Sequence, residues 1–109
     1  MADDVLQRLA AIIDARREES ARASYTRQLL DAGPERCARK LGEEATETII
    51  AALGSDRRAL AREAADLIFH LLVLLASRRL PLTAVLDELE GRMGTSGLAE
   101  RAARDAPGP

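Results

Sequence analysis

Five carboxylates on two neighbouring segments are the residues of this sequence best suited to chemistry. They follow the patterns E-E-x-x-E and E-x-x-D, and their positions are Glu43, Glu44, Glu47, Glu63 and Asp66. Spacings of three and four residues put side chains on one face of a helix. The two patterns therefore predict a pair of carboxylates on each of two helices.

The turn between the two segments decides whether these carboxylates can meet. Gly54-Ser55 is short, and a short connection makes two helices antiparallel neighbours. At about 100° per residue, the acids of each helix border its apolar stripe. The stripes contain Cys37, Leu41, Ala45, Thr48 and Ala52 in the first helix, and Leu60, Ala64, Leu67, Leu71 and Leu74 in the second. We therefore expect the two acid pairs to converge where the helices pack.

A simpler explanation of the same acids is a pair of solvated helix faces, with an ordinary ion pair between Lys40 and Glu44. Such exposed ion pairs contribute only about 0–1 kcal/mol each. The charge balance favours another explanation, because the five acids have only Lys40, Arg62 and His70 as cationic neighbours. Partly desolvated carboxylates without compensation are unfavourable by several kcal/mol per ion. A divalent cation would supply the missing charge.

The ligand types select the cation. Carboxylate oxygens suit Mg²⁺, with Mn²⁺ as the alternative, whereas Zn²⁺ prefers the sulfur and nitrogen of which this chain has only Cys37 and His70. Mg²⁺ retains waters and binds phosphate oxygens, so the pattern predicts hydrolysis of a polyphosphate. His70 and Cys37 lie in apolar stretches, where a lone histidine is more often a satisfied core residue than a catalyst.

Hydrophobic periodicity predicts an all-α fold. We expect helices over about 4–19, 34–53, 55–77 and 82–92, with one short helical turn before Gly33. No stretch alternates with the period of a strand. The segment from Leu67 to Ala76 is apolar on almost every side, so a single copy would leave part of it exposed. The expected architecture is a four-to-five-helix up-down bundle that is completed by dimerisation.

Composition narrows the possible classes of protein. The 109 residues are 47% hydrophobic, which suits one all-α domain over residues 1–105, with 106–109 as a disordered tail. A net charge of -2 and 2% aromatic residues give no basis for binding nucleic acid or an anionic membrane. The single cysteine and the absence of a basic secretory start at the N-terminus predict a cytoplasmic protein.

The carboxylate pattern resembles that of the MazG-type all-α nucleotide pyrophosphohydrolases. More narrowly, segments along nearly the whole chain resemble the phosphoribosyl-ATP pyrophosphohydrolase family of histidine biosynthesis. In chain order these segments are Ser24-Tyr25-Thr26, Lys40-Leu41-Gly42-Glu43-Glu44-Ala45-Thr46-Glu47, Glu63-Ala64-Ala65-Asp66-Leu67, His70-Leu71-Leu72-Val73-Leu74 and Gly94-Thr95-Ser96-Gly97-Leu98. One departure is Arg79-Leu80-Pro81, where the resemblance implies a turn that contains glycine.

The resemblance implies hydrolysis of phosphoribosyl-ATP between its α and β phosphates, giving phosphoribosyl-AMP and pyrophosphate. It also implies at least a dimer and a functional coupling to phosphoribosyl-AMP cyclohydrolase. It assigns the metal to Glu44, Glu47, Glu63 and Asp66. It further places Glu43 in the same site as a ligand or as a base that orients water, so that the catalytic residues are Glu43, Glu44 and Glu47.

Polar residues in three places are candidates for substrate binding, namely Lys40, Ser24, Tyr25, Thr26, Thr95 and Ser96. Lys40 lies one turn before Glu44, from where it could reach a phosphate. The 24–26 segment could bind ribose or phosphate, or could cap a turn. The 95–96 pair precedes a short helix expected at 98–104 and suits a phosphate cradle, although a flexible linker is the other explanation.

Two rival functions remain open at this point. A related enzyme of the same superfamily would hydrolyse deoxynucleoside or nucleoside triphosphates instead of phosphoribosyl-ATP. A non-catalytic helical dimerisation module would use its acids only for solubility. Only the first of these rivals would release pyrophosphate in the presence of Mg²⁺.

Overall fold

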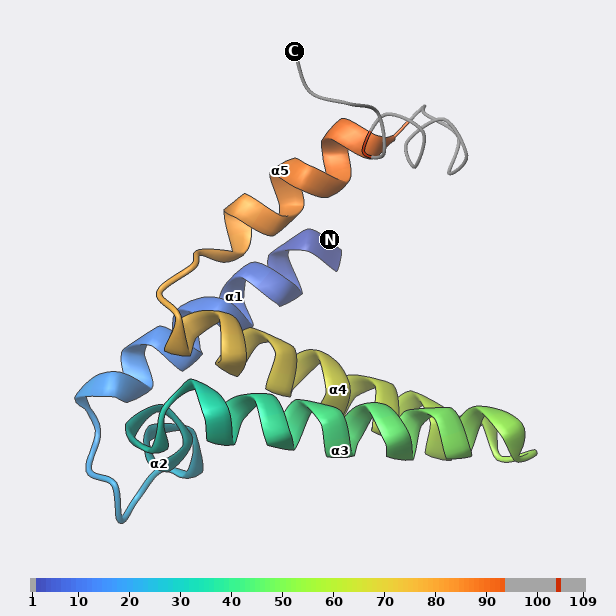
Figure 1. Ribbon diagram of the computed structural model, residues 1–109, viewed down its shortest axis with the longest axis horizontal. Helices are drawn as coiled ribbons and strands as arrows, with labels where there is room; N and C mark the ends of the chain where they lie inside the picture. Colours follow the sequence, from blue (N-terminus) through green and yellow to red (C-terminus); the bar gives the residue numbers. More distant parts are fainter. Residues whose placement is uncertain (1, 94–103, 105–109) are drawn as a thin grey trace.

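A computed structural model describes residues 2–93 and 104 of the chain, with side chains from residue 5 onward. The described part consists of helices joined by short turns and contains no strand, which confirms the predicted all-α class (Figure 1). Its elements, in order, are α1 (Ala2–Ala15), the 3-10 turn η1 (Arg16–Glu18), α2 (Tyr25–Ala32), α3 (Pro34–Leu53), α4 (Arg57–Ser77) and α5 (Leu82–Arg92). No helix in residues 2–93 combines the length and the apolar character needed to cross a membrane.

Helices α3 and α4 form a long antiparallel hairpin, as the short turn between them predicts (Figure 1). Gly33, at a φ of 93°, ends the preceding helix in a conformation that favours glycine, and Pro34 then occupies the first turn of α3. The Asp56 side chain accepts hydrogen bonds from the backbone N–H groups of Arg58 and Ala59 at 3.0 and 3.1 Å. This capping explains why α4 begins at Arg57.

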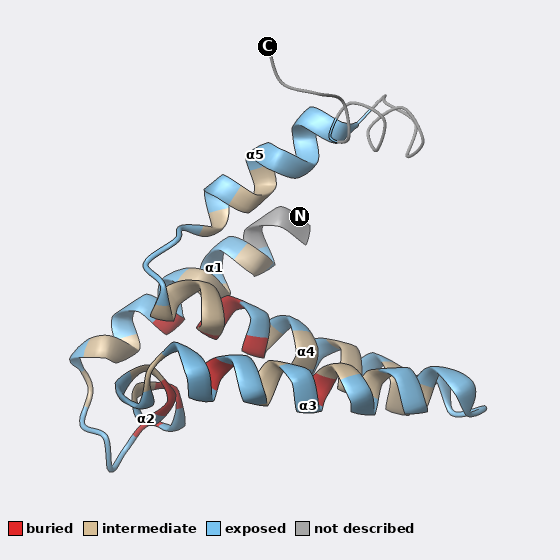
Figure 2. Ribbon diagram, in the orientation of Figure 1, coloured by how far each residue is buried: buried red, intermediate tan, exposed pale blue. Residues whose placement is uncertain are grey.

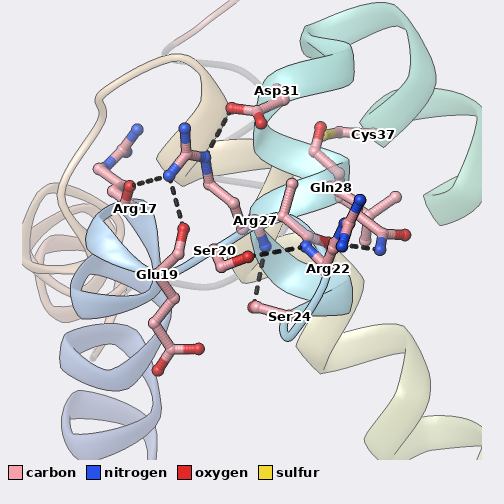
Figure 3. A network of polar contacts seen from close by, with 11 residues as sticks. Arg17, Glu19, Ser20, Arg22, Ser24, Arg27, Gln28, Asp31 and Cys37 are labelled. Carbon is pink, nitrogen blue, oxygen red and sulfur yellow. Dashed lines mark hydrogen bonds and ion pairs between the residues drawn. The ribbon is translucent and has the colours of Figure 1, made fainter.

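The helix expected over 4–19 is interrupted near its end, because α1 stops at Ala15 and continues as the 3-10 turn η1. A network of arginine contacts fixes this region (Figure 3). The Arg27 guanidinium of α2 donates to the main-chain oxygens of Arg17 and Glu19 at 2.8 and 2.6 Å. Arg17 in turn donates to the main-chain oxygen of Ala76. These contacts join α2 to the last turn of α4 through η1.

The hydrophobic core lies at one end of the hairpin, where α1 and α2 cover it (Figure 2). Its buried members come from four helices and are Ile13, Leu29, Cys37, Leu72 and Val73. The sequence predicted that Leu71 would pack with its stripe, but Leu71 is 38% exposed. The buried face of α4 is rotated towards His70, Leu72 and Val73, because α1 and α2 also pack on this helix and change which side is covered.

Away from the hydrophobic core, more of the helix surface is exposed to solvent. The tip of the hairpin carries exposed apolar side chains, including Leu53, which is 85% exposed. Helix α5 leaves the end of α4 and extends away from the α3–α4 hairpin (Figure 1). The tail expected at 106–109 and the helix expected at 98–104 lie outside the described residues, apart from residue 104.

Candidate metal and substrate site

Three of the predicted carboxylates meet between α3 and α4. Glu44 comes from α3, Glu63 and Asp66 come from α4, and one oxygen of each lies within 4.8 Å of the others. The spacing of three residues puts Glu63 and Asp66 on one face of α4, and the antiparallel hairpin brings Glu44 opposite them. We refer to these three residues as the acidic cluster. Their meeting confirms the predicted convergence of acids from the two helices.

The acidic cluster is sheltered on one side and open on the other. Glu44 is only 8% exposed and Glu63 is half-buried, whereas Asp66 is exposed. The Oε2 atoms of Glu44 and Glu63 are both buried, and neither has a hydrogen-bond partner in the described part of the chain. Buried polar atoms are nearly always paired, so these oxygens fit the ligands of a hard cation. The exposed Asp66 gives the acidic cluster contact with solvent, and Mg²⁺ keeps waters and phosphate oxygens among its ligands.

The electrostatics of the acidic cluster favour a bound cation. Burial raises the pKa of both Glu44 and Glu63, and interaction with the Glu47 carboxyl raises the pKa of each of them further. Glu47 itself is exposed on α3. Because its carboxyl interacts with both Glu44 and Glu63, Glu47 is adjacent to the acidic cluster. It is not one of the three members that converge. Four carboxylates that repel one another in a partly desolvated place would be stabilised by a divalent ion.

Lys40 lies at the edge of the acidic cluster and partly neutralises it. Its Nζ atom is 3.1 Å from Oε2 of Glu43 and 3.9 Å from Oε1 of Glu44. The hydrogen bond with Glu43 raises the pKa of Lys40. The side chain of Glu43 is 53% exposed, and its carboxylate is paired with Lys40 rather than grouped with the other three. The predicted ion pair between Lys40 and Glu44 is present, but Glu43 is the closer partner.

Thr48 connects the backbones of the two helices beside the acidic cluster, a role that its place in the predicted apolar stripe did not anticipate. Its hydroxyl lies 2.8 Å from the main-chain oxygen of Glu44, one turn earlier in α3. The same hydroxyl lies 3.0 Å from the main-chain oxygen of Glu63 in α4. A threonine within an otherwise apolar stripe was the available signal, because a buried hydroxyl needs a partner.

The three side chains of the 24–26 segment, at the start of α2, have different surroundings. The Ser24 hydroxyl accepts a hydrogen bond from the backbone N–H of Arg27 at 3.1 Å and so caps α2 (Figure 3). Thr26 is buried, whereas Tyr25 is 50% exposed. The Tyr25 hydroxyl lies 3.1 Å from Nε2 of His70. Among these three residues, Tyr25 is the one that presents half of its surface to solvent.

His70 is a satisfied core histidine, as its apolar surroundings in the sequence predicted. It is only 7% exposed, and its Nδ1 atom lies 2.8 Å from the main-chain oxygen of Asp66. Phe69 packs edge-on against its ring, with 5.1 Å between the ring centroids. Both ring nitrogens therefore have a hydrogen-bond partner. The other predicted substrate-binding pair, Thr95 and Ser96, lies outside the described residues.

Comparison with known proteins covers most of the chain. The family model described as phosphoribosyl-ATP pyrophosphohydrolase matches residues 6–93. A phosphoribosyl-ATP pyrophosphatase of Cereibacter sphaeroides is 55% identical over 100 residues, which are 92% of this chain and 97% of the relative. One from Nitrobacter winogradskyi is 59% identical over 97 residues, which are 89% of this chain and 84% of the relative. The chain therefore belongs to the phosphoribosyl-ATP pyrophosphohydrolase family, a family of hydrolases.

Proposed function

We propose that this chain hydrolyses phosphoribosyl-ATP to phosphoribosyl-AMP and pyrophosphate, the second step of histidine biosynthesis, in a reaction that depends on Mg²⁺. The observation that carries the proposal is the acidic cluster, in which two buried carboxylate oxygens of Glu44 and Glu63 have no partner. The relatives named phosphoribosyl-ATP pyrophosphatase match the chain over most of its length, which supports this substrate.

The acidic cluster would hold the cation. Glu44, Glu63 and Asp66 supply three oxygen ligands, and Glu47 is the fourth candidate because its carboxyl interacts with both glutamates. Mn²⁺ would fit the same ligands. A cation bound there would neutralise the charge of the polyphosphate and make its phosphorus more open to attack by water. The three ligands come from both helices, so the hairpin itself would set the geometry of the site.

Glu47 and Glu43 would complete the catalytic set with different tasks. The exposed carboxylate of Glu47, beside Glu44 and Glu63, is suited to orient the attacking water and to accept its proton. The oxygen of this water would bond to phosphorus as the bond to the leaving pyrophosphate breaks. Glu43 holds the Lys40 ammonium at 3.1 Å and would keep it at the edge of the site. Its contribution would therefore be exerted through Lys40.

Lys40 would bind a phosphate of the substrate, because its charge lies at the open edge of a site that must accept a polyanion. Replacing Lys40 by Ala should raise KM by about tenfold, as expected for the loss of a hydrogen bond to a charged group. Arg39→Ala is the matched control, since Arg39 is the exposed neighbour in α3 and has no assigned role. Unchanged kinetics in Lys40→Ala would dismiss the phosphate contact.

The decisive experiment is an assay of pyrophosphate release by the purified protein. Phosphoribosyl-ATP should be hydrolysed with Mg²⁺ and not with EDTA, and common nucleoside and deoxynucleoside triphosphates should be much poorer substrates. Glu44→Gln and Asp66→Asn should each lower kcat by at least about 100-fold. A faster reaction with a deoxynucleoside triphosphate would assign the chain to the rival activity. Full activity of both variants would refute the metal mechanism.

We also propose that the active form is a homodimer. Apolar side chains stay exposed on α3 and α4, and these are Ile49, Ile50, Leu53, Ile68 and Leu71. Large apolar side chains that stay exposed on two neighbouring helices are a feature of surfaces that bind another protein chain. Sedimentation of the wild type at micromolar concentration should give the mass of two chains, and Ile68→Glu should reduce it to that of one. A wild type that sediments as a monomer would contradict the proposal.

A further inference from the structure

A cleft of about 650 Å³ lies between α1, the end of α4 and the start of α5. This volume is within the range of small-molecule sites, which is about 300–1,000 Å³. We refer to it as the α1–α4 cleft. None of the three residues of the acidic cluster lines it, and its α4 residues, from Leu72 to Ala76, follow Asp66 by roughly two to three turns. The cleft is therefore separate from the candidate metal site.

The wall of the α1–α4 cleft is mainly apolar. It includes four side chains that belong to the hydrophobic core or pack against it, namely Leu72, Leu75, Ala76 and Leu82. Leu80 also lines the cleft and is 44% exposed. Removing apolar surface of this kind from water is favourable. The cleft is therefore suited to a ligand with an apolar carbon skeleton.

Three charged residues line the same cleft, and they are Asp14, Arg17 and Arg79. Nε of Arg17 donates to Asp14 at 2.9 Å, and Nη2 of Arg17 donates to the main-chain oxygen of Ala76. These contacts hold the Arg17 guanidinium and leave its Nη1 group unpaired in the part of the chain that the structure describes. The Arg79 side chain has no hydrogen bond or ion pair with any other described residue. Two guanidinium groups against one carboxylate leave one unbalanced positive charge.

The backbone conformation at Arg79 does not by itself explain an arginine. Arg79 lies just beyond the end of α4 and has a φ of 55°, a left-handed conformation that is unfavourable for residues with a Cβ atom. Glycine would remove this strain, but it would also remove the guanidinium. Strained backbone of this kind is concentrated at ligand sites, where the surrounding structure holds it. A charge that acts at the cleft therefore explains the arginine better than the turn does.

We propose that the α1–α4 cleft binds a small molecule that combines an apolar carbon skeleton with one carboxylate. The apolar wall covers the skeleton, while Arg79 and the Nη1 group of Arg17 donate hydrogen bonds to the carboxylate. A single carboxylate matches the one unbalanced positive charge, whereas a phosphate monoester would bring nearly two negative charges. This site does not depend on the proposed function, because no residue of the acidic cluster takes part in it.

NMR titration of the whole ¹⁵N-labelled chain tests the site. The probe is phenylbutyrate, an apolar skeleton with one carboxylate, and phenylbutyramide is its uncharged analogue. Phenylbutyrate should shift the backbone signals of residues that line the cleft, such as Ala10 and Ala76, and should leave those of the acidic cluster in place. Phenylbutyramide should shift the same signals and bind about tenfold more weakly, the effect of losing a hydrogen bond between charged groups.

Two variants separate the charge from the apolar wall. Arg79→Gly removes the guanidinium and suits the left-handed backbone, so the fold should be preserved. It should weaken phenylbutyrate binding by about tenfold and leave phenylbutyramide binding unchanged. Ala11→Phe, at an exposed position of α1 that lines the cleft, should block both probes. Arg78→Ala is the matched control, because it removes the same charge from an exposed neighbour outside the cleft, and it should change neither affinity.

Four results would overturn the proposal. The first is the absence of any shift with phenylbutyrate at millimolar concentration, and the second is equal affinity for the two probes. The third is a set of shifts on the exposed apolar residues of the hairpin, such as Ile49 and Leu53, instead of the cleft. The fourth is a response of the cleft signals to protein concentration alone, which would show that a second copy covers this surface. Circular dichroism of every variant identifies any loss of helix.

Discussion

The Thr48 hydroxyl lies 3.0 Å from the main-chain oxygen of Glu63 on the neighbouring helix. It lies 2.8 Å from the main-chain oxygen of Glu44 on its own helix, so its single proton is shared between these two acceptors. Each acceptor belongs to a residue whose carboxylate enters the acidic cluster. The distance between the α3 and α4 backbones at the acidic cluster therefore depends on this hydroxyl.

Replacing Thr48 by Val removes the hydroxyl and keeps the shape of the side chain. We expect the Mg²⁺ affinity to fall by about tenfold, as for other residues that orient metal ligands, and the free energy of unfolding to fall by about 1 kcal/mol. Calorimetric titration of Mg²⁺ and urea unfolding measure the two effects. Thr48→Ser retains the hydroxyl and should bind Mg²⁺ nearly as the wild type does. A Val variant with wild-type affinity would exclude the positioning role.

Glu63→Gln should separate stability from activity. The change removes one of several carboxylates that repel one another in a partly sheltered place, so the metal-free protein should have a higher Tm than the wild type. The same change removes a metal ligand and should lower kcat by at least about 100-fold. Thermal unfolding in EDTA and the hydrolysis assay give the two values.

The control for this experiment is Glu90→Gln on α5, which is exposed and outside the acidic cluster, and which should change neither value. Mg²⁺ at about 100 times its Kd should stabilise the wild type by about 2.7 kcal/mol and the Glu63→Gln variant by much less. A lower Tm for Glu63→Gln in EDTA would mean that Glu63 stabilises the metal-free fold.

The stability of the metal-free protein should depend on pH in a direction set by Glu44 and Glu63. Burial first, and then the Glu47 carboxyl, raise the pKa of both groups above the value they have in the unfolded chain. The folded protein therefore holds protons that the unfolded chain has already released. Stability should fall as the pH rises from the ordinary pKa of glutamate through the raised values.

Mg²⁺ should reverse this dependence, because the ligands must lose their protons before they bind the ion. Its affinity should increase over the same range of pH in which the metal-free protein loses stability. The measurement is Tm against pH with EDTA and with Mg²⁺, compared between the wild type and the Glu44→Gln/Glu63→Gln double variant. If the difference between the two proteins is independent of pH, the acidic cluster does not titrate as described.

Arg79 has a φ of 55°, in the left-handed region that favours glycine. It follows the end of α4, at the turn where the family resemblance implied a glycine and this sequence has Arg79-Leu80-Pro81. The backbone thus adopts the left-handed conformation at Arg79 although this position has no glycine. Arg79→Gly should increase the free energy of unfolding by about 1 kcal/mol, measured by urea unfolding. Arg78→Gly is the control, since Arg78 has a φ of -99°, and it should bring no gain.

Sequence alone determined the helices and the meeting of acids from two of them. Apolar periodicity fixed the helical class, while local chemistry fixed the ends, as in the Asp56 cap and the left-handed Gly33. The short turn at residues 54–56 left α3 and α4 no arrangement other than an antiparallel one. These features depend on neighbours within a few positions in the chain, and a single sequence therefore contains the information that specifies them.

Only the tertiary structure decided which side chains share an environment. It buried Glu44 while leaving Glu43 with Lys40, and it exposed Leu71, which periodicity had placed in the core. It also brought together Tyr25 and His70, which are 45 positions apart. Such pairings depend on how far each helix rotates about its own axis when several others pack against it. Periodicity limits this rotation to a face about 100° wide, which is too broad to distinguish adjacent glutamates.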